Sequence, residues 1–330
     1  MAEWFYEAGI GEARAALVED GAILEALIEP NGAQPRPGTI AEGRLIQILI
    51  PRVRGVVVLS DGIEVLVEPL RREWTEGAVV CIEVVREAIA EPGRTKRAKA
   101  RPVERQIPVE GPDLRARLDA STLRVVEIAP RDTDRLEEMG WSEVLEHARS
   151  GIVGFSGGTL IISPTPAMTV IDVDGHLPPA ALALAAAGAV GRAIRRLGIA
   201  GSIGVDFPTL AGKAERTALG GAFDAALPLP FERTAVNGFG FMQVVRPRAR
   251  ASLIEHIRSD PAGHCARALL RRTARAQLIG SITLAAHPNV VAALTLQPAW
   301  TETLGRSLGG GVALRSDPAL AMSGGYAEPA

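Results

Sequence analysis

The sequence predicts an α/β (α+β) multidomain protein, and three observations support this fold class. Short apolar segments separated by tight turns crowd roughly the first hundred residues, which favours a small β-barrel. Further along, two apolar segments that each end on aspartate flank an alanine-rich segment, a pattern typical of parallel strands joined by a helix. The 330 residues suffice for about two or three domains, each with its own core.

The first part of the chain consists of expected strands and hairpins. Residues 12–27 alternate around Asp20-Gly21, a pair that tolerates the positive φ angles of a primed hairpin turn. A second group of strands is expected at 43–50, at 55–67 with a turn at Asp61-Gly62, and at 78–85. This group suggests a barrel of the oligonucleotide-binding (OB) type. The basic stretch 94–105 is expected to be a linker or an exposed loop.

The rest of the chain mixes helices and strands. Helix 179–197 is the clearest element, because proline stands at its start, arginines occupy its last turns and Gly198 offers a C-cap. The other expected elements are strand 123–128, a helix near 137–148, a turn at 155–159, strands 160–162, 168–173 and 203–206, helix 213–219, strands within 234–245, and a basic helical segment 251–277. The tail is predicted to be strand 282–286, helix 290–304 and strand 311–314, a small βαβ-like unit.

Acidic residues end the two strands that flank helix 179–197. Asp172 and Asp174 belong to the first strand, and Asp206 ends the second. The C-terminal ends of two such parallel strands can share one crevice. Carboxylates brought together there repel one another unless a cation or a proton intervenes, and Mg²⁺ is often held by one or two carboxylates. The pattern is that of a metal-dependent phosphodiesterase. The plainer alternative is that these aspartates cap the following helix or turn.

Several short motifs resemble one protein family. They are Gly157-Gly158 before a strand, Thr169-Val170-Ile171-Asp172-Val173-Asp174-Gly175, Val205-Asp206-Phe207, and Phe239-Gly240-Phe241 followed by Arg246-Pro247-Arg248. With the Asp20-Gly21 turn, they resemble the ribonuclease E/G family over most of the chain. The resemblance implies a Mg²⁺-dependent endoribonuclease that cleaves single-stranded RNA in processing or decay. Asp172 and Asp206 would be metal ligands, and Asp174, where the family has asparagine, would support them at the metal and in catalysis.

The resemblance also implies a domain order, in which an OB-type barrel is inserted in an RNase H-like layer and is followed by a DNase I-like catalytic subdomain. The expected segments are 1–35 (N-terminal hairpin of the RNase H-like layer), 36–105 (barrel and basic linker), 106–150 (remainder of the layer), 151–278 (catalytic subdomain) and 279–330 (small C-terminal α/β unit).

The chain departs from the family pattern at several places. The interval before Phe155 is too short for the family's 5′-monophosphate sensor, so cleavage without 5′-end sensing is expected. The family's zinc-sharing Cys-Pro-x-Cys pair is absent and Cys265 stands alone, so neither structural zinc nor zinc-linked assembly is expected. Aliphatic residues replace the aromatic residues of the barrel face, and Ser163 and Thr209 stand where the family has acidic residues.

Arginine and lysine side chains are the expected phosphate contacts, because arginine binds phosphate bidentately. The candidates are Arg246, Arg248, Arg233, Arg44, Lys96 and Arg97. Three functions follow from these patterns: the endoribonuclease, a catalytically degenerate RNA-binding protein of the same family, and a metal-dependent phosphohydrolase of small nucleotides. Mn²⁺ suits the same oxygen ligands as Mg²⁺.

Composition narrows the class of protein. With 36 basic and 38 acidic residues the net charge is −2, so RNA binding would depend on local patches. The two cysteines, Cys81 and Cys265, argue against a disulfide framework. No secretion signal is recognisable at the N-terminus, and the longest apolar run, near 180–190, is too short to span a bilayer. We expect a cytoplasmic protein, and the sequence leaves its oligomeric state open, a homodimer included.

Overall fold

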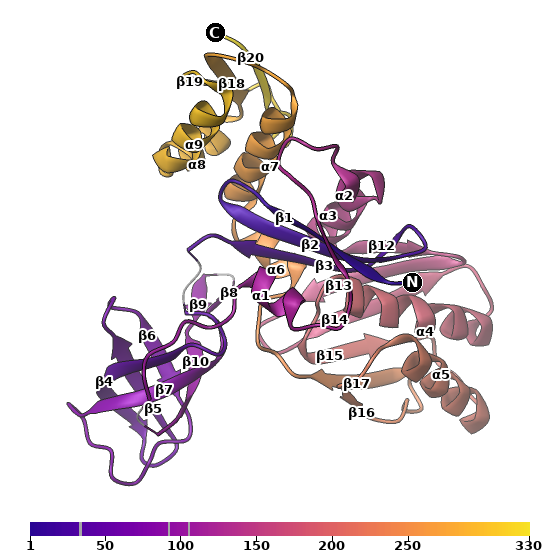
Figure 1. The fold of residues 1–330 in the computed structure, drawn as a ribbon. Coiled ribbons are helices and arrows are strands. Elements are labelled where there is room, and N and C mark those ends of the chain that lie inside the picture. Colours follow the sequence, from indigo (N-terminus) through magenta and orange to yellow (C-terminus); the bar gives the residue numbers. More distant parts are fainter. Residues whose placement is uncertain (33–34, 92, 105) are drawn as a thin grey trace. The chain divides into compact units, whose positions relative to one another are not determined.

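The computed structural model describes residues 1–32, 35–91, 93–104 and 106–330, and its elements are labelled in Figure 1. The chain forms two compact units, each built from segments that are distant in sequence. The first unit contains Met1–Gly32, Leu118–Glu143 and Ile257–Ala330, and the second contains Ala33–Arg117 and Val144–His256. The chain passes between units within helices α1 (Leu114–Asp119), α3 (Trp141–Ser150) and α6 (Leu253–Ser259).

The N-terminal part of the first unit is a four-stranded sheet. Its order is β11-β1-β2-β3, with β1 at Glu3–Ala8, β2 at Glu12–Glu19, β3 at Ala22–Pro30 and β11 at Val125–Glu127; the short helix α2 spans Arg135–Glu138. The predicted hairpin is confirmed, since Asp20 and Gly21 join β2 to β3 with φ angles of 50° and 77°. Both angles are positive, as a primed turn requires.

The C-terminal part of the first unit confirms the predicted parallel pair, in which β18 and β19 are joined through helices. The elements are α7 (Pro261–Arg275), β18 (Ile282–Ala286), α8 (Pro288–Thr295), α9 (Pro298–Leu308), β19 (Val312–Ser316) and β20 (Tyr326–Pro329), with sheet order β19-β18-β20. The single helix predicted at 290–304 is wrong. Pro298 lacks a backbone N–H and its ring cannot follow a preceding turn, so one helix ends and another begins there.

The second unit contains the predicted barrel, which is closed and has five strands. Its order is β10-β6-β5-β4-β7, with β4 at Ile40–Ile50, β5 at Arg54–Leu59, β6 at Glu64–Val67, β7 at Val79–Arg86 and β10 at Ala98–Pro102; β8 (Ile89–Glu91) and β9 (Arg94–Lys96) form a small hairpin. Alternate side chains of the strands fill the interior with valine, leucine, isoleucine and alanine.

The prediction of a linker or loop at 94–105 is corrected by β9 and β10. Strand β10 pairs with β6 on one side and with β7 on the other, and thereby closes the barrel. Ala98 and Ala100 point into the barrel and are buried, whereas Lys99 and Arg101 point outward. The strand was not predicted because its inward-facing residues are alanines, which give only a weak apolar alternation within a basic stretch. Arg105 lies outside the described residues.

A six-stranded sheet with two helices forms the rest of the second unit. The order is β12-β13-β14-β15-β17-β16, with β12 at Ile152–Phe155, β13 at Gly158–Pro164, β14 at Thr169–Gly175, β15 at Gly201–Asp206, β16 at Glu232–Arg233 and β17 at Phe241–Arg246. Helices α4 (Pro179–Arg196) and α5 (Lys213–Ala226) pack against each other, and α4 covers β12, β13 and β14 (Figure 1). Among the described residues, no helix has the length and apolar character needed to cross a membrane.

Candidate active site

Two aspartates end the central parallel strands of the six-stranded sheet. Strand β14 runs parallel to β15, and the last residue pair of this ladder is Asp172 with Asp206. Neighbouring strands are about 5 Å apart, and paired residues point to the same face. Ile171 and Val205, which point to the other face, are fully buried, whereas both aspartates are exposed. The two carboxylates therefore leave the sheet side by side, at the C-terminal edge of both strands.

Asp174 lies on the same face as Asp172, two residues further along β14. It pairs with Thr159 of β13 and extends beyond the last residue of β15. Two residues of a strand span about 7 Å, so Asp174 is further from Asp206 than Asp172 is. Its Oδ1 accepts a hydrogen bond of 2.8 Å from the backbone N–H of Gly175. Asp174 thus combines the turn role that its sequence position indicates with a place at the margin of the carboxylate pair.

The carboxylate pair fits a hard divalent cation. Mg²⁺ takes oxygen ligands and is commonly bound through one or two carboxylates, with waters and substrate phosphates completing the octahedron. Asp172 and Asp206 supply two carboxylates on an exposed face, which leaves room for those other ligands. The described part of the chain contains no group of three or more His, Cys, Asp or Glu residues arranged to hold a metal.

Aromatic residues flank the acidic edge. Phe241 pairs directly with Asp206, and its ring lies over Gly204, where an added Cβ would be 2.7 Å from the ring. Phe239 is 82% exposed. Asn237 holds this loop, because its Oδ1 accepts hydrogen bonds from the N–H groups of Phe239 (2.9 Å) and Phe241 (3.0 Å). In the sequence, these phenylalanines stand out only as part of a family motif. Their position beside Asp206 could not be predicted, because it depends on how β15 and β17 pair.

Arg246 and Arg248 are not brought together with the aspartates. Arg246 pairs with Gly201, at the opposite end of β15 from Asp206, about 16 Å away along the strand. Its Nη1 donates to the carbonyl of Ile199 at 3.0 Å. Arg248 follows further from the acidic edge and forms an ion pair with Glu255. The two arginines expected as the foremost phosphate contacts therefore lie at the wrong end of the sheet for a phosphate held by the aspartates.

The other predicted phosphate contacts are bound to protein groups. Arg233 pairs in register with buried Val244, and its Nε and Nη2 donate to the two oxygens of Asp224 at 2.6 Å each. The hydrogen bond from Arg233 holds the pKa of Asp224 below its ordinary value. Arg44, on barrel strand β4, donates to the Gly77 carbonyl (2.7 Å). Lys96, at the end of β9, pairs with Glu91 (3.0 Å), and Arg97, between β9 and β10, pairs with Glu64 (2.7 Å).

Ser163 and Thr209, which stand where the family has acidic residues, lie at different places relative to the carboxylate pair. Ser163 pairs with Val170, on the part of β13 that runs away from the acidic edge. Thr209 lies just beyond Asp206, and its hydroxyl donates to the Phe239 carbonyl at 3.3 Å. Thr209 therefore supplies no carboxylate; its hydrogen bond instead fixes the loop that carries Phe239.

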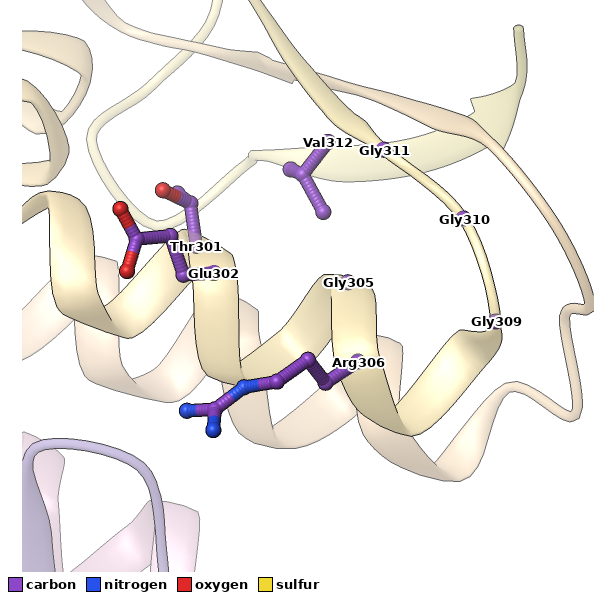
Figure 2. A pocket seen from close by; sticks show the side chains of 8 residues that line it. All are labelled: Thr301, Glu302, Gly305, Arg306, Gly309, Gly310, Gly311 and Val312. Carbon is purple, nitrogen blue, oxygen red and sulfur yellow. The ribbon is translucent and has the colours of Figure 1, made fainter.

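A hollow of about 680 Å³ in the first unit contains none of the predicted site residues. It lies between α9 and the loop that leads to β19, and Figure 2 shows Gly309, Gly310 and Gly311 along that loop. Glu302 and Arg306 are its charged lining residues. With one charge of each sign, this hollow offers no site for an anionic strand.

Comparison with protein-family models gave no match for this chain, and comparison with curated proteins likewise gave none.

Proposed function

We propose that the protein is a Mg²⁺-dependent endoribonuclease that hydrolyses phosphodiester bonds of single-stranded RNA without sensing a 5′-monophosphate. The observation that carries this proposal is the register of β14 and β15, which places Asp172 directly beside Asp206 on an exposed face. Two adjacent exposed carboxylates suit a cation that also binds a substrate phosphate. The motif resemblance to the ribonuclease E/G family gives the same two residues the role of metal ligands.

The fold proposal follows the same resemblance. The closed five-stranded barrel would be the OB-type module, the sheet that contains β14 and β15 would be the DNase I-like subdomain, and the sheet β11-β1-β2-β3 would belong to the RNase H-like layer. The arrangement of short barrel strands and tight turns supports the first assignment. The parallel pair with its helical crossover supports the second.

Each residue at the acidic edge has a defined task in the proposed reaction. Asp172 and Asp206 would hold Mg²⁺, or Mn²⁺ in its place, and Asp174 would orient a metal-bound water or a ligand from the margin. When bound, the cation supplies charge neutralisation at the phosphate and acidifies a water for in-line attack. Phe241 and Phe239 would stack on bases next to the scissile phosphate, a contact that every base can make. Base stacking without edge-specific hydrogen bonds predicts loose sequence preference.

The second candidate function is an RNA-binding protein that does not cleave. It is favoured by Ser163 and Thr209, uncharged residues at positions where the family has acidic residues, and by the aliphatic residues that replace aromatic ones on the barrel face. The exposed aromatic loop serves this function as well, because stacking requires no metal.

Cleavage of end-labelled single-stranded RNA separates the two functions. Wild type, Asp172→Asn/Asp206→Asn and the control Asp20→Asn would be assayed in Mg²⁺, in Mn²⁺ and in EDTA. Asp20 is an exposed hairpin-turn residue where asparagine is equally tolerated, so this control retains full activity. The endoribonuclease predicts metal-dependent cleavage that only the double variant loses. Binding without cleavage by wild type would establish the RNA-binding protein, and equal cleavage by all three variants would refute the aspartate site.

A further inference from the structure

A cationic cavity of about 300 Å³ lies along helix α5 in the second unit. Its walls are the first two turns of α5, represented by Lys213, Arg216 and Gly220, and the segment from Arg233 to Val236. Three of the described residues that line it are cationic and none is acidic. The cavity is at the small end of ligand sites, which admits a phosphate with part of its ribose and excludes folded RNA.

The charge of this cavity is only partly neutralised. Asp224 pairs with Arg233, whereas Arg216 donates through Nη1 to two neutral carbonyls, those of Leu210 (2.7 Å) and Ala211 (3.1 Å). Among the described residues, the Lys213 ammonium has no hydrogen-bonding or ion-pair partner. The N-terminus of α5 adds no further positive charge, because Glu215 in its first turn accepts a hydrogen bond from the N–H of Gly212 at 3.1 Å. Two positive charges therefore face the cavity without an acidic partner.

Glycine at position 220 makes room for one of these cations. A Cβ at Gly220 would lie 2.8 Å from Nη2 of Arg233 and 3.1 Å from its Cζ, so the guanidinium rests directly on the helix backbone. Glycine inside a helix costs about 1 kcal/mol relative to alanine. Gly221 follows in the same helix with open space around it. The first glycine is thus required by the placement of Arg233, and the second is not.

Both walls of the cavity continue into the acidic edge. The loop that Arg216 fastens at residues 210–211 begins directly after Asp206. On the other wall, Val236 precedes Asn237, whose N–H donates to the carbonyl of Phe241 at 3.0 Å. Phe241 in turn pairs with Asp206. Arg233 pairs with Val244, which lies with Ile203 on the buried face of the sheet, so its side chain leaves the sheet on the face opposite Asp206. A strand held by the aspartates therefore reaches Lys213 by passing around the C-terminal edge of β15.

We propose that this cavity is a phosphate subsite for the RNA strand whose scissile phosphate is held at Asp172 and Asp206; the inference rests on the proposed function. Lys213 and Arg216 bind the phosphate oxygens, and Arg233, fixed by Asp224 and seated on Gly220, forms the floor. The same chemistry would take an internal phosphodiester or a 5′-terminal phosphate. Arginine N–H groups in a fixed geometry and a free ammonium are the donors that phosphate binding favours.

Binding of a fluorescent single-stranded RNA, measured by anisotropy in EDTA at several salt concentrations, tests the subsite. Lys213→Gln removes an ammonium that has no structural partner, so it is expected to weaken binding several-fold. The slope of log K against log salt should become shallower by about 0.7 for each phosphate that the variant no longer neutralises. Gly220→Ala, which displaces Arg233, should weaken binding as well, and Gly221→Ala should leave it unchanged. RNAs with a 5′-phosphate or a 5′-hydroxyl distinguish the source: an effect confined to the former identifies a terminal phosphate.

Cleavage measured on the same RNA in Mg²⁺ separates failure of the subsite from failure of the proposed function. Wild-type cleavage combined with unchanged affinity and salt slope in Lys213→Gln overturns the subsite and leaves the nuclease standing. Absence of cleavage combined with weakened binding in Lys213→Gln and Gly220→Ala supports the subsite and overturns the nuclease. If neither the wild type nor any variant binds RNA, the phosphate subsite and the nuclease are both overturned.

Discussion

Asp172 and Asp206 are directly paired residues on two parallel neighbouring strands, and they leave the sheet on the same exposed face. Asp174 shares that face but lies two residues further along β14, with its Oδ1 engaged by the N–H of Gly175. Asp172 and Asp206 can therefore bind one cation together, whereas Asp174 lies further from it. This difference can be tested with isosteric amide substitutions, because none of the three carboxylates is buried.

Asp172→Asn and Asp206→Asn are each expected to lower Mg²⁺-dependent cleavage more than about 100-fold, because even outer-shell partners of a metal are worth about 10–100-fold. Asp174→Asn should lower cleavage by only about 10- to 100-fold, as expected for an outer-shell partner. Single-turnover cleavage rates over a Mg²⁺ series measure the difference, and circular dichroism confirms that the fold is retained. A loss in Asp174→Asn as large as that in Asp172→Asn would make Asp174 a direct ligand and contradict the assignment.

Phe239→Ala should weaken RNA binding without changing stability. The ring is 82% exposed, so its removal uncovers no core, while base stacking is worth about 1–3 kcal/mol, or roughly 5- to 150-fold in affinity. The matched control is Ile279→Ala, which removes another exposed apolar side chain (92%) from the first unit. Anisotropy titrations with both variants make the comparison. Equal affinities for wild type and Phe239→Ala would exclude this residue as a stacking platform.

Local signals in the sequence were sufficient for some elements. The Asp20-Gly21 turn and the two aspartate-ending strands were predictable because turn chemistry and apolar runs act over a few residues. Strand β10 was not, since its inward positions are the small residues Ala98 and Ala100 within a basic stretch. Strand β1 was also missed; it carries an acidic residue, Glu7, which is buried and forms ion pairs with both Arg14 and Arg275, neither of which lies on this strand.

The positions of Arg246 and Arg248 relative to the aspartates depend on the direction of β17, which no local sequence pattern encodes. Strand β17 runs antiparallel to β15, so its first residue, Phe241, meets Asp206 and its last residue, Arg246, meets Gly201. A basic stretch that follows β17 is therefore carried away from the acidic edge. Lys213, which was expected only as the start of a helix, lies at the N-terminus of α5, and the loop 207–212 connects this helix to the strand that ends at Asp206.

Glu12→Gln should destabilise the first unit by about 3–5 kcal/mol. Glu12 is 3% exposed and accepts hydrogen bonds of 2.9 Å from both Arg267 and Arg271, so the change removes the carboxylate that two buried guanidinium groups share and leaves Arg267 with Asp260 alone. Urea unfolding followed by tryptophan fluorescence in a Trp74→Phe background reports on this unit, which contains the other three tryptophans. The control Glu328→Gln breaks the exposed pair with Arg315 and should cost less than about 1 kcal/mol. Equal effects of the two variants would refute the role of the buried network.

His264 should make the stability of the first unit sensitive to mildly acidic pH. Burial lowers the pKa of its imidazole, and the charges of Arg267 and Arg271 act in the same direction, against those of Glu12 and Asp260. Below its ordinary pKa of about 6.5 the unfolded chain therefore binds a proton that the folded chain resists. Stability from this group is complete above that pH and is lost as the pH falls toward the folded pKa, by at most about 1.4 kcal/mol per pH unit.

His264→Gln should flatten this decline in the free energy of unfolding, measured by urea titrations in the same Trp74→Phe background at a series of pH values on both sides of about 6.5. His176→Gln alters an exposed histidine of the second unit and should leave the decline in place. The two variants separate histidine titration from acid effects on carboxylates. Protonation of Asp134, whose pKa is held below its ordinary value by Arg14 and Arg275 despite burial, acts only at more acidic pH. A decline of equal slope in wild type and His264→Gln would show that another group senses the proton, because removal of the imidazole removes its proton linkage entirely.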